Sequence, residues 1–419
     1  MINVFKFGGA SVKDAAAVRN MSAIVSSHTQ EPLVVVVSAM GKTTNAIERI
    51  HALRFEGKNY EQELSELINY HRSMVDELFP ADDHGLAALQ QHVNAFKALL
   101  ATPCSHAFDE EYDSLIGFGE LISTAIVEAF FRSQHIASEW FDARTMIITD
   151  DRFRDARVDW DVSAQHVGVL QSALEHGKVC VMQGFIGSTK LGRSTSLGRE
   201  GSDFTAAIMA YLLDATSVTI WKDVPGMLNA DPKKFSDTVK LDRISFKEAI
   251  ELAYYGASVI HPKTIKPLQN KGIPLYIKSF IDPSAEGTVI QESTECDHLI
   301  PCYIVKENQV LLSISTRDFS FIVEDNLKEI FEIFSRLGIR IHLMENSAIS
   351  FSVVFDDDTY KLPELLKTLE EHYAVRYNKE LQLVTVRHGD DDAAVRLSGG
   401  KELILEQRSR QTLRLVVRA

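Results

Sequence analysis

Cysteine and positive charge are both scarce in this chain of 419 residues. Its four cysteines are Cys104, Cys180, Cys296 and Cys302, and no histidine motif completes a zinc pattern around them. We therefore predict reduced thiols and no metal-ligating cluster. Lys and Arg number 44 against 58 Asp and Glu, which gives a formal net charge of -14. This acidic excess argues against nucleic acid or an anionic lipid surface as the main partner.

Long apolar runs are missing as well. No stretch reaches the roughly 18 residues that are needed to span a bilayer. The N-terminal residues MINVFKFGG lack the basic flank and apolar centre of a signal peptide. We therefore expect a cytoplasmic protein without a membrane segment. The hydrophobic fraction of 45% and the chain length allow two or three domains, each with its own core.

Up to Phe280 the chain alternates strand patterns with helical ones. A strand–loop–helix pattern occurs twice near the N-terminus, which predicts a doubly wound, mostly parallel α/β domain. Polar helices are expected over residues 59–101, with a break at Pro80 and Asp82-Asp83. The predicted strands are Ile2–Phe7, Leu33–Val37, Val179–Ile186, Val218–Trp221 and Leu275–Phe280, and the stronger predicted helices are Ser114–Arg132 and Ile244–Gly256.

The stretch Thr195–Asp203, TSLGREGSD, is the most suggestive part of this domain. It leads into a helical pattern, and Ser202 or Asp203 suits the N-cap of that helix. A glycine-rich loop that enters a helix presents backbone N–H groups to an anion. The guanidinium of Arg199 can bind a carboxylate through two hydrogen bonds. Taken alone, the stretch fits a solvated loop before a capped helix equally well.

Two further polar residues have plain structural interpretations. Glu120 falls off the apolar stripe of its helix, so spacing alone favours a solvated glutamate. His261 precedes a proline, and this position favours a structural cap over a catalytic base.

The pattern changes after a polar, turn-rich linker from Asp282 to Thr294. Strands alternate with helices in the order βαββαβ, which predicts a ferredoxin-like α+β unit. The last residues favour a hairpin of Glu402–Gln407 and Thr412–Val417. The expected strands of the unit are Val310–Ser315, Ile339–Met344, Ile349–Phe355 and Leu381–Val386, and its helices are Leu327–Arg336 and Leu362–His372.

Six sequence blocks occur in one order along the chain. They are KFGGAS from Lys6, VSAMGKTTN from Val37, GFGE from Gly117, LGREGSD from Leu197, KDVPG from Lys222 and GASVIHPKT from Gly256. Together they resemble the aspartokinases of the amino-acid kinase superfamily, and the tail resembles ACT-type units. The resemblance implies transfer of the γ-phosphoryl group of ATP to the side-chain carboxylate of L-aspartate, with Mg²⁺. The product, 4-phospho-L-aspartate, begins the biosynthesis of lysine, threonine and methionine.

The resemblance also implies roles for individual residues. Lys6 would offset charge on the transferred group, and Asp203 would orient groups around it. Arg199 would bind the substrate α-carboxylate and Glu120 its ammonium group. The implied sets are catalytic Lys6 and Asp203; substrate-binding Ser38, Thr44, Glu120, Arg199 and Ser202; and nucleotide-binding Lys6, Gly8, Gly9, Ser11, Lys222, Asp223, Leu228, Lys233 and Ser258.

By the same resemblance, the chain divides into a mostly parallel three-layer kinase domain at 1–285 and a linker at 286–304. An ACT-like regulatory unit at 305–388 and a truncated second unit at 389–419 follow. A homodimer or homotetramer through this tail is expected, with lysine or threonine as candidate effectors. A purely structural tail remains the alternative.

The sequence departs from the family pattern on the nucleotide side. Lys222, Leu228, Lys233 and Ser258 stand where threonine, tyrosine, arginine and lysine are usual. In the tail, His342 stands where lysine-binding relatives have an aspartate, so lysine regulation is not carried over. Two other functions stay open: a kinase of another carboxylate such as glutamate, and a non-catalytic amino-acid sensor.

Overall fold

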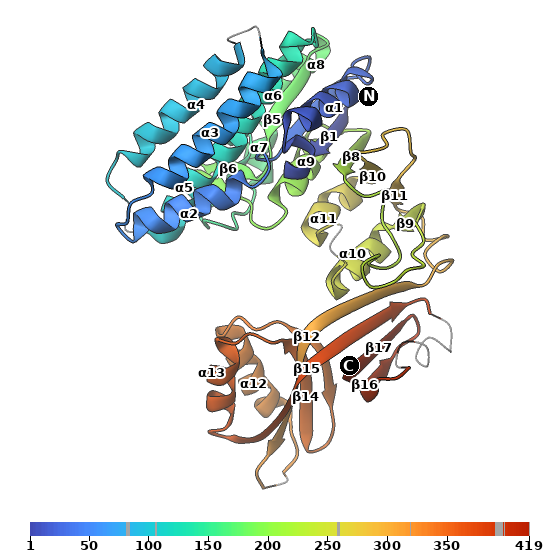
Figure 1. Ribbon diagram of the computed structural model, residues 1–419. Helices are drawn as coiled ribbons and strands as arrows, with labels where there is room; N and C mark the ends of the chain where they lie inside the picture. The colour runs from blue at the N-terminus through green and yellow to red at the C-terminus, as the bar shows by residue number, and fades with distance from the viewer. Residues whose placement is uncertain are drawn as a thin grey trace. The chain divides into compact units, whose positions relative to one another are not determined.

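The computed structural model describes residues 1–80, 84–104, 107–257, 260–318, 320–389, 397 and 399–418. The chain forms two compact units (Figure 1). The first unit comprises residues 1–227, 240–250 and 258–296. The second comprises residues 228–239, 251–257 and 297–419.

An eight-stranded sheet forms the centre of the first unit, in the order β3-β5-β2-β1-β8-β10-β11-β9. All neighbouring strands pair in parallel except β10 and β11. The strands are β1 Asn3–Phe7, β2 Leu33–Val37, β3 Ser138–Phe141, β5 Val179–Gln183, β8 Ser217–Lys222, β9 Arg243–Ser245, β10 Leu275–Ser279 and β11 Thr288–Gln291.

The central strands are buried from end to end, as expected for a sheet covered on both faces. All five residues of β2, Leu33–Val37, are buried. Strand β1 lies between β2 and β8, and Lys6 is in register with Val36 on one side and Ile220 on the other. This register places Lys6 at the carboxyl edge of the sheet.

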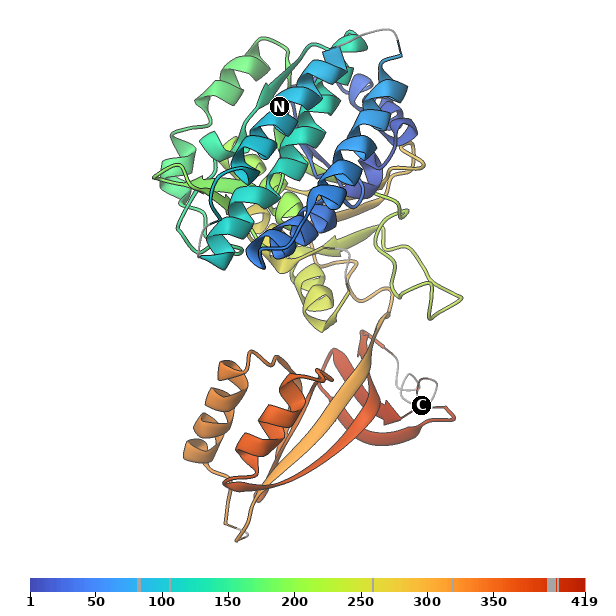
Figure 2. The same cartoon turned by 60° about the vertical axis from the view of Figure 1, so that its left-hand side comes forward.

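Two groups of helices contact this sheet, which gives the predicted three layers (Figures 1 and 2). One group packs around α6 and includes α1 to α4, and the other packs around α9 and includes α7 and α11. The helices are α1 Ala15–Ser26, α2 Thr43–Phe55, α3 Glu61–Leu78, α4 His84–Leu100, α5 Phe108–Ile116, α6 Phe118–Ser133, α7 Trp160–Ala164, α8 Gly168–Glu175, α9 Gly201–Leu212, α10 Phe246–Tyr255 and α11 Pro262–Lys271.

The helix predicted at Ser114–Arg132 is divided in the structure. Helix α5 ends at Ile116 and α6 begins at Phe118, with Gly117 between them. Together, Phe108–Ser133 are long and apolar enough to cross a membrane, but 94% of the apolar window is buried inside the protein. No other helix among the described residues has this length and composition. The burial is that of core helices, because apolar side chains here face protein.

A small sheet in the order β4-β6-β7 carries the loop that leads to α9. Its strands are β4 Ile148–Thr149, β6 Ile186–Thr189 and β7 Ser194–Ser196. The single strand predicted at Val179–Ile186 was therefore wrong. It ends at Gln183, and the chain turns at Phe185, which has a φ of 72°, before β6 begins in the other sheet.

A six-stranded antiparallel sheet forms the centre of the second unit, in the order β13-β14-β12-β15-β17-β16. Helices α12 and α13 pack on it over a core that includes Leu312, Phe334 and Phe355. The predicted βαββαβ order and the terminal hairpin are confirmed. The elements are β12 Cys302–Thr316, α12 Glu324–Arg336, β13 Ile341–Asn346, β14 Ser350–Asp356, α13 Lys361–Leu369, β15 Tyr373–Arg387, β16 Glu402–Arg408 and β17 Thr412–Arg418.

Two boundaries differ from the predicted pattern. The polar stretch Asp282–Thr294 contains strand β11, which pairs with β10 and β9. The stretch predicted as helical from Ile244 begins instead in strand β9, and the helix starts at Phe246. Both strands are short, with three residues in β9 and four in β11, so the sequence offers too few positions for an alternating pattern.

Candidate active site

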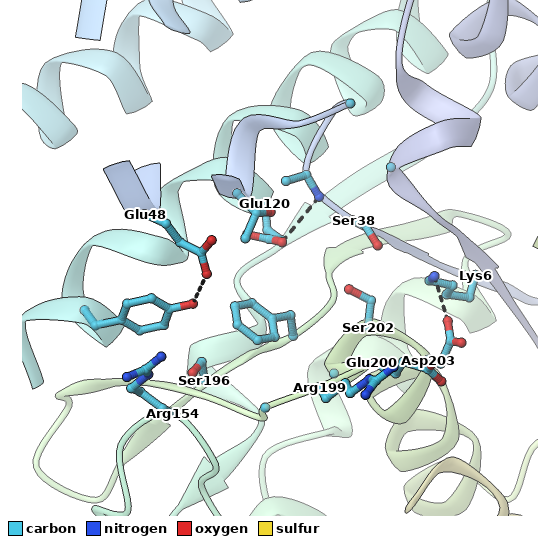
Figure 3. A pocket seen from close by; sticks show the side chains of 18 of the residues that line it. Lys6, Ser38, Glu48, Glu120, Arg154, Ser196, Arg199, Glu200, Ser202 and Asp203 are labelled. Atoms are coloured by element: carbon cyan, nitrogen blue, oxygen red, sulfur yellow. Dashed lines mark hydrogen bonds and ion pairs between the residues drawn. The ribbon is translucent and has the colours of Figure 1, made fainter. Parts of the chain in front are cut away.

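A polar cleft of about 560 Å³ lies in the first unit, where β1, β2 and β8 end (Figure 3). This carboxyl edge is where open α/β sheets bind ligands. The cleft brings together nine of the predicted site residues: Lys6, Gly9, Ser38, Thr44, Glu120, Arg199, Ser202, Asp203 and Lys222.

The loop Thr195–Asp203 forms one wall of the cleft and has a constrained backbone. Gly198 has a φ of 75°, and a Cβ atom there would lie 2.7 Å from Asp155 Oδ1. Glu200 adopts the left-handed conformation with a φ of 54° and is the N-cap of α9. The prediction of Ser202 or Asp203 as N-cap was therefore wrong. Both lie inside the first turn, where the carboxylate of Asp203 interacts favourably with the helix dipole.

Two lysines converge on the buried carboxylate of Asp203. Lys6 Nζ lies 2.6 Å from Asp203 Oδ1, and Lys222 Nζ lies 3.5 Å from Asp203 Oδ2. Burial alone would raise the pKa of Asp203, but the two lysines outweigh burial and hold that pKa below its usual value. Two ammonium groups thus meet at one carboxylate, and ammonium groups of this kind suit the phosphates of a nucleotide.

Glu120 lies at the other end of the cleft and is buried, with 3% of its surface exposed. Its Oε1 accepts a hydrogen bond from Ala39 N at 3.4 Å, and its Oε2 has no hydrogen-bond partner among the described residues. Burial raises the pKa of Glu120 to about 8. The interpretation as a solvated helix glutamate was therefore wrong, because α6 begins inside the protein at this point.

The remaining substrate-side residues surround the same space. Figure 3 shows the side chains of Ser38 and Ser202 facing the region between Glu120 and Lys6. Thr44 lines the cleft from the first turn of α2, and Arg199 lines it as an exposed residue of the loop. The site thus offers a cation, hydroxyl groups and a buried carboxylate.

The glycine-rich turn after β1 lies close to this site. A Cβ atom on Gly9 would lie 2.9 Å from Ala39 O, and one on Gly8 would lie 3.3 Å from Lys6 Nζ. Ser11 is buried in the short 3-10 turn Gly9–Val12. A side chain on Gly9 would therefore displace the loop that carries Ser38.

Four nucleotide-side residues remain: Asp223, Leu228, Lys233 and Ser258. Asp223 is exposed and does not line the cleft. Leu228 and Lys233 belong to the second unit, and Ser258 lies outside the described residues. Their roles stay predictions. His261 does cap α11, since its side chain accepts a hydrogen bond from Lys263 N, and this prediction is confirmed.

The sequence did not identify a cluster at the substrate side of the cleft. The Tyr112 hydroxyl donates a hydrogen bond to Glu48 Oε1 at 2.8 Å, and the Arg154 guanidinium lies 4.6 Å from the Tyr112 ring centroid. Glu48 follows Thr44 by four residues on α2, so helical spacing was the available signal for it. No local pattern indicated Tyr112 or Arg154.

Asp113 connects two segments that line this side of the cleft. Its carboxylate accepts hydrogen bonds from Arg154 N at 2.9 Å, from Ser196 N at 2.8 Å and from Ser196 Oγ at 2.6 Å. Burial raises the pKa of Asp113 above its ordinary value. These bonds fix the loop of Arg154 to the strand that precedes Arg199.

Comparison with known proteins identifies the family. A sequence model of the Amino acid kinase family matches residues 1–279. The lysine-sensitive aspartokinase 3 of Escherichia coli is 33% identical over 399 residues, which are 93% of this chain and 87% of that protein. The chain belongs to the aspartokinases. A bifunctional aspartokinase/homoserine dehydrogenase of Arabidopsis thaliana is 30% identical, and the match covers 42% of its length.

Solved aspartokinases share the fold over the whole chain. Escherichia coli aspartokinase III in complex with lysine and aspartate has a TM-score of 0.82 at 30% identity and covers 100% of this chain and 96% of its own. The same enzyme with aspartate and ADP has a TM-score of 0.81 at 29% identity, with the same coverage of both chains. The prediction of a mostly parallel, doubly wound kinase domain followed by ferredoxin-like ACT units is confirmed.

Proposed function

We propose that this chain transfers the γ-phosphoryl group of ATP to the side-chain carboxylate of L-aspartate and forms 4-phospho-L-aspartate and ADP. One observation carries the proposal. The cleft holds the buried carboxylate of Glu120 at one end, with no hydrogen-bond partner for Oε2 among the described residues, and the Lys6–Asp203–Lys222 cluster at the other. An amino acid needs the first for its ammonium group, and a phosphoryl donor needs the second. The complex of the Escherichia coli enzyme with aspartate and ADP supports the choice of ligands.

In the proposed reaction, Glu120 and Arg199 bind the charged groups on the α-carbon of aspartate. Ser38, Thr44 and Ser202 donate hydrogen bonds to the bound substrate. A side-chain carboxylate oxygen attacks the γ-phosphorus, the bond to the β–γ bridging oxygen breaks, and its electron pair leaves with ADP. The nucleophile is already ionised at neutral pH, so no general base is needed.

The cations of the cleft then act on the transferred group. Lys6 offsets the negative charge on its oxygens, and Lys222 assists from the neighbouring strand. Asp203 holds the two ammonium groups in place through the ion pairs at 2.6 Å and 3.5 Å. Catalysis in this scheme consists of positioning and charge neutralisation.

Mg²⁺ fits this site as a companion of ATP. The described residues contain no cluster of three or more metal-ligating side chains. Protein-bound Mg²⁺ keeps several waters and often takes only one or two carboxylates together with substrate phosphates. Asp203 is the carboxylate that would serve. When bound, the ion neutralises charge on the adjacent phosphates.

The acceptor assay tests this function. ADP formation is measured with L-aspartate, with L-glutamate and without acceptor. We expect turnover with aspartate alone. Turnover with glutamate at an equal or higher rate would favour the other carboxylate kinase, and none with either acceptor would favour an amino-acid sensor.

We further propose a cytoplasmic enzyme of the lysine, threonine and methionine pathway, with the kinase domain at 1–285 and regulatory units after the linker. The ACT-like unit would form a homodimer or homotetramer, because pairing covers open sheet edges and exposed apolar groups such as Phe321 and Tyr360. His342 is buried and paired with Asp356 at 2.9 Å, which leaves the effector open.

Titration of the intact enzyme with lysine, threonine and methionine tests the regulatory role. Light scattering of the same samples tests the assembly. A monomer whose activity none of the three amino acids alters would support a purely structural tail.

A further inference from the structure

A second cleft of about 460 Å³ lies in the first unit, among helices α7, α9 and α11. One wall is aromatic. Trp160 begins α7, and its ring lies 6.4 Å from that of Phe204 and 5.0 Å from that of Tyr211, both edge to face. Phe204 and Tyr211 are seven residues apart and share one face of α9.

Basic side chains also line the cleft. Lys263 and Lys266 line the cleft from one face of α11, together with Pro267 and Asn270, and Arg157 lines it from the segment before α7. Among the described residues that line the cleft, none is acidic. Lys266 and Arg157 are exposed at its rim. In a chain with a net charge of -14, this is a local concentration of positive charge.

We propose that this cleft binds a planar aromatic ring that carries one anionic group, either a carboxylate or a phosphate. The ring would pack against Trp160 and Tyr211, since aromatic pairs favour edge-to-face and offset contacts. The anion would bind Lys266 and Arg157 through charge-assisted hydrogen bonds. The volume is within the range of small-molecule sites, and no lining residue is shared with the substrate cleft.

Lys263 connects the two clefts physically. Its Nζ lies 5.1 Å from the Phe204 ring centroid, 2.9 Å from Leu197 O and 2.8 Å from Asp155 Oδ1. Leu197 and Phe204 flank the segment that carries Arg199 and Asp203. An anion that draws Lys263 toward the second cleft would therefore loosen the loop, and the KM for aspartate would rise.

Calorimetry on the intact chain tests the site, with aspartate and a non-hydrolysable ATP analogue present to occupy the first cleft. The probes are phenylpyruvate and AMP, which distinguish a carboxylate from a phosphate source. Pyruvate lacks the ring and benzyl alcohol lacks the charge. The variants are Lys266→Glu and Arg157→Glu, and Lys97→Glu is the matched control, an exposed lysine on α4 outside both clefts.

We expect at least one probe to bind, and both reference compounds to bind about tenfold more weakly or not at all. Each charge reversal in the cleft should weaken the binding of that probe about tenfold, and the control should leave it within about twofold. No binding of either probe, or unchanged binding in both cleft variants, would overturn the site. Binding without a change in the KM for aspartate would overturn the coupling through Lys263.

Discussion

Asp203 at one end of the substrate cleft and Glu120 at the other are each 3% exposed. The pKa of Asp203 is nevertheless lowered by Lys6 and Lys222, against the effect of burial, whereas burial raises the pKa of Glu120 to about 8. Because the burial is equal, the neighbouring charges decide the sign of the shift.

The difference indicates how each end is used. At the Asp203 end two lysines already face the carboxylate, so this end can receive an anion without a change of protonation. Among the described residues no cation pairs with Glu120, so the ammonium group of a ligand can take that place. An amino acid and a nucleotide together match both ends of the cleft.

Removal of Lys6 should cause the largest loss of activity, at the Asp203 end of the cleft. In Lys6→Ala, Lys222 at 3.5 Å is the one cation among the described residues that still pairs with Asp203, and the cation beside the transferred phosphoryl group is lost. We expect kcat to fall about 10²–10³-fold, as for other lost electrostatic contacts of this kind. The rate of ADP formation measures this. Lys13→Ala, an exposed lysine on the following segment, is the control, and a Lys6 variant within about threefold of it would contradict the assignment.

Loss of either charged contact to aspartate should impair substrate binding at the Glu120 end of the cleft. Glu120→Gln, measured at pH 9 where most of Glu120 is ionised, and Arg199→Ala should each raise the KM for aspartate by about one to two decades, since a charged hydrogen bond contributes roughly 1.5–3 kcal/mol. The KM for ATP should stay unchanged. Initial rates with each substrate varied in turn separate the two effects, and an equal loss on both would show that these residues do not contact aspartate.

The pKa of Glu120, about 8, predicts a pH dependence. The raised value means that the free enzyme holds this carboxyl protonated below pH 8, and only its ionised form attracts the substrate ammonium. From pH 7 to pH 9 the ionised fraction rises about tenfold, and kcat/KM for aspartate should rise with it until the ammonium itself titrates. Glu120→Gln should flatten this profile. A profile that is the same in both proteins would assign the titration to another group.

Features that depend on a few neighbouring residues were predictable from the sequence. The run Leu33–Val37 is buried throughout as expected, and His261 caps α11. The left-handed backbone of Glu200 was not predictable. It moves the start of α9 to Gly201, and only contact with the surrounding loops holds a non-glycine residue in that conformation.

Features that depend on distant segments required either the family resemblance or the structure. Lys6 and Asp203 are separated by almost 200 residues, and the order of strands in the sheet brings them together. The burial of Glu120 likewise results from the packing of Gly119 against Ala39, 3.0 Å from a Cβ atom placed on the glycine. Helical spacing within α6 carries no information about the contact with Ala39, and no local pattern indicates the pairing of Lys6 with Asp203.

Asp113→Asn is the mildest of these changes, because it alters the support of the cleft and no residue that contacts substrate. The carboxylate accepts two backbone N–H groups at Oδ2 and the Ser196 hydroxyl at Oδ1. An asparagine that keeps the first two turns its N–H₂ group toward the Ser196 hydroxyl, whose own hydrogen then loses its acceptor. An unsatisfied buried donor costs about 1–3 kcal/mol, so thermal unfolding should shift to lower temperature by several degrees.

The loops of Arg154 and Arg199 would loosen together, and we expect the KM for aspartate to rise about three- to tenfold, with the KM for ATP unchanged. Asp109→Asn is the control, since Asp109 lies on the same helix as Asp113. Its ion pair with Arg154 at 3.2 Å is exposed, and exposed ion pairs contribute little to stability. A variant at Asp113 that loses stability but keeps the KM for aspartate would restrict this residue to a folding role.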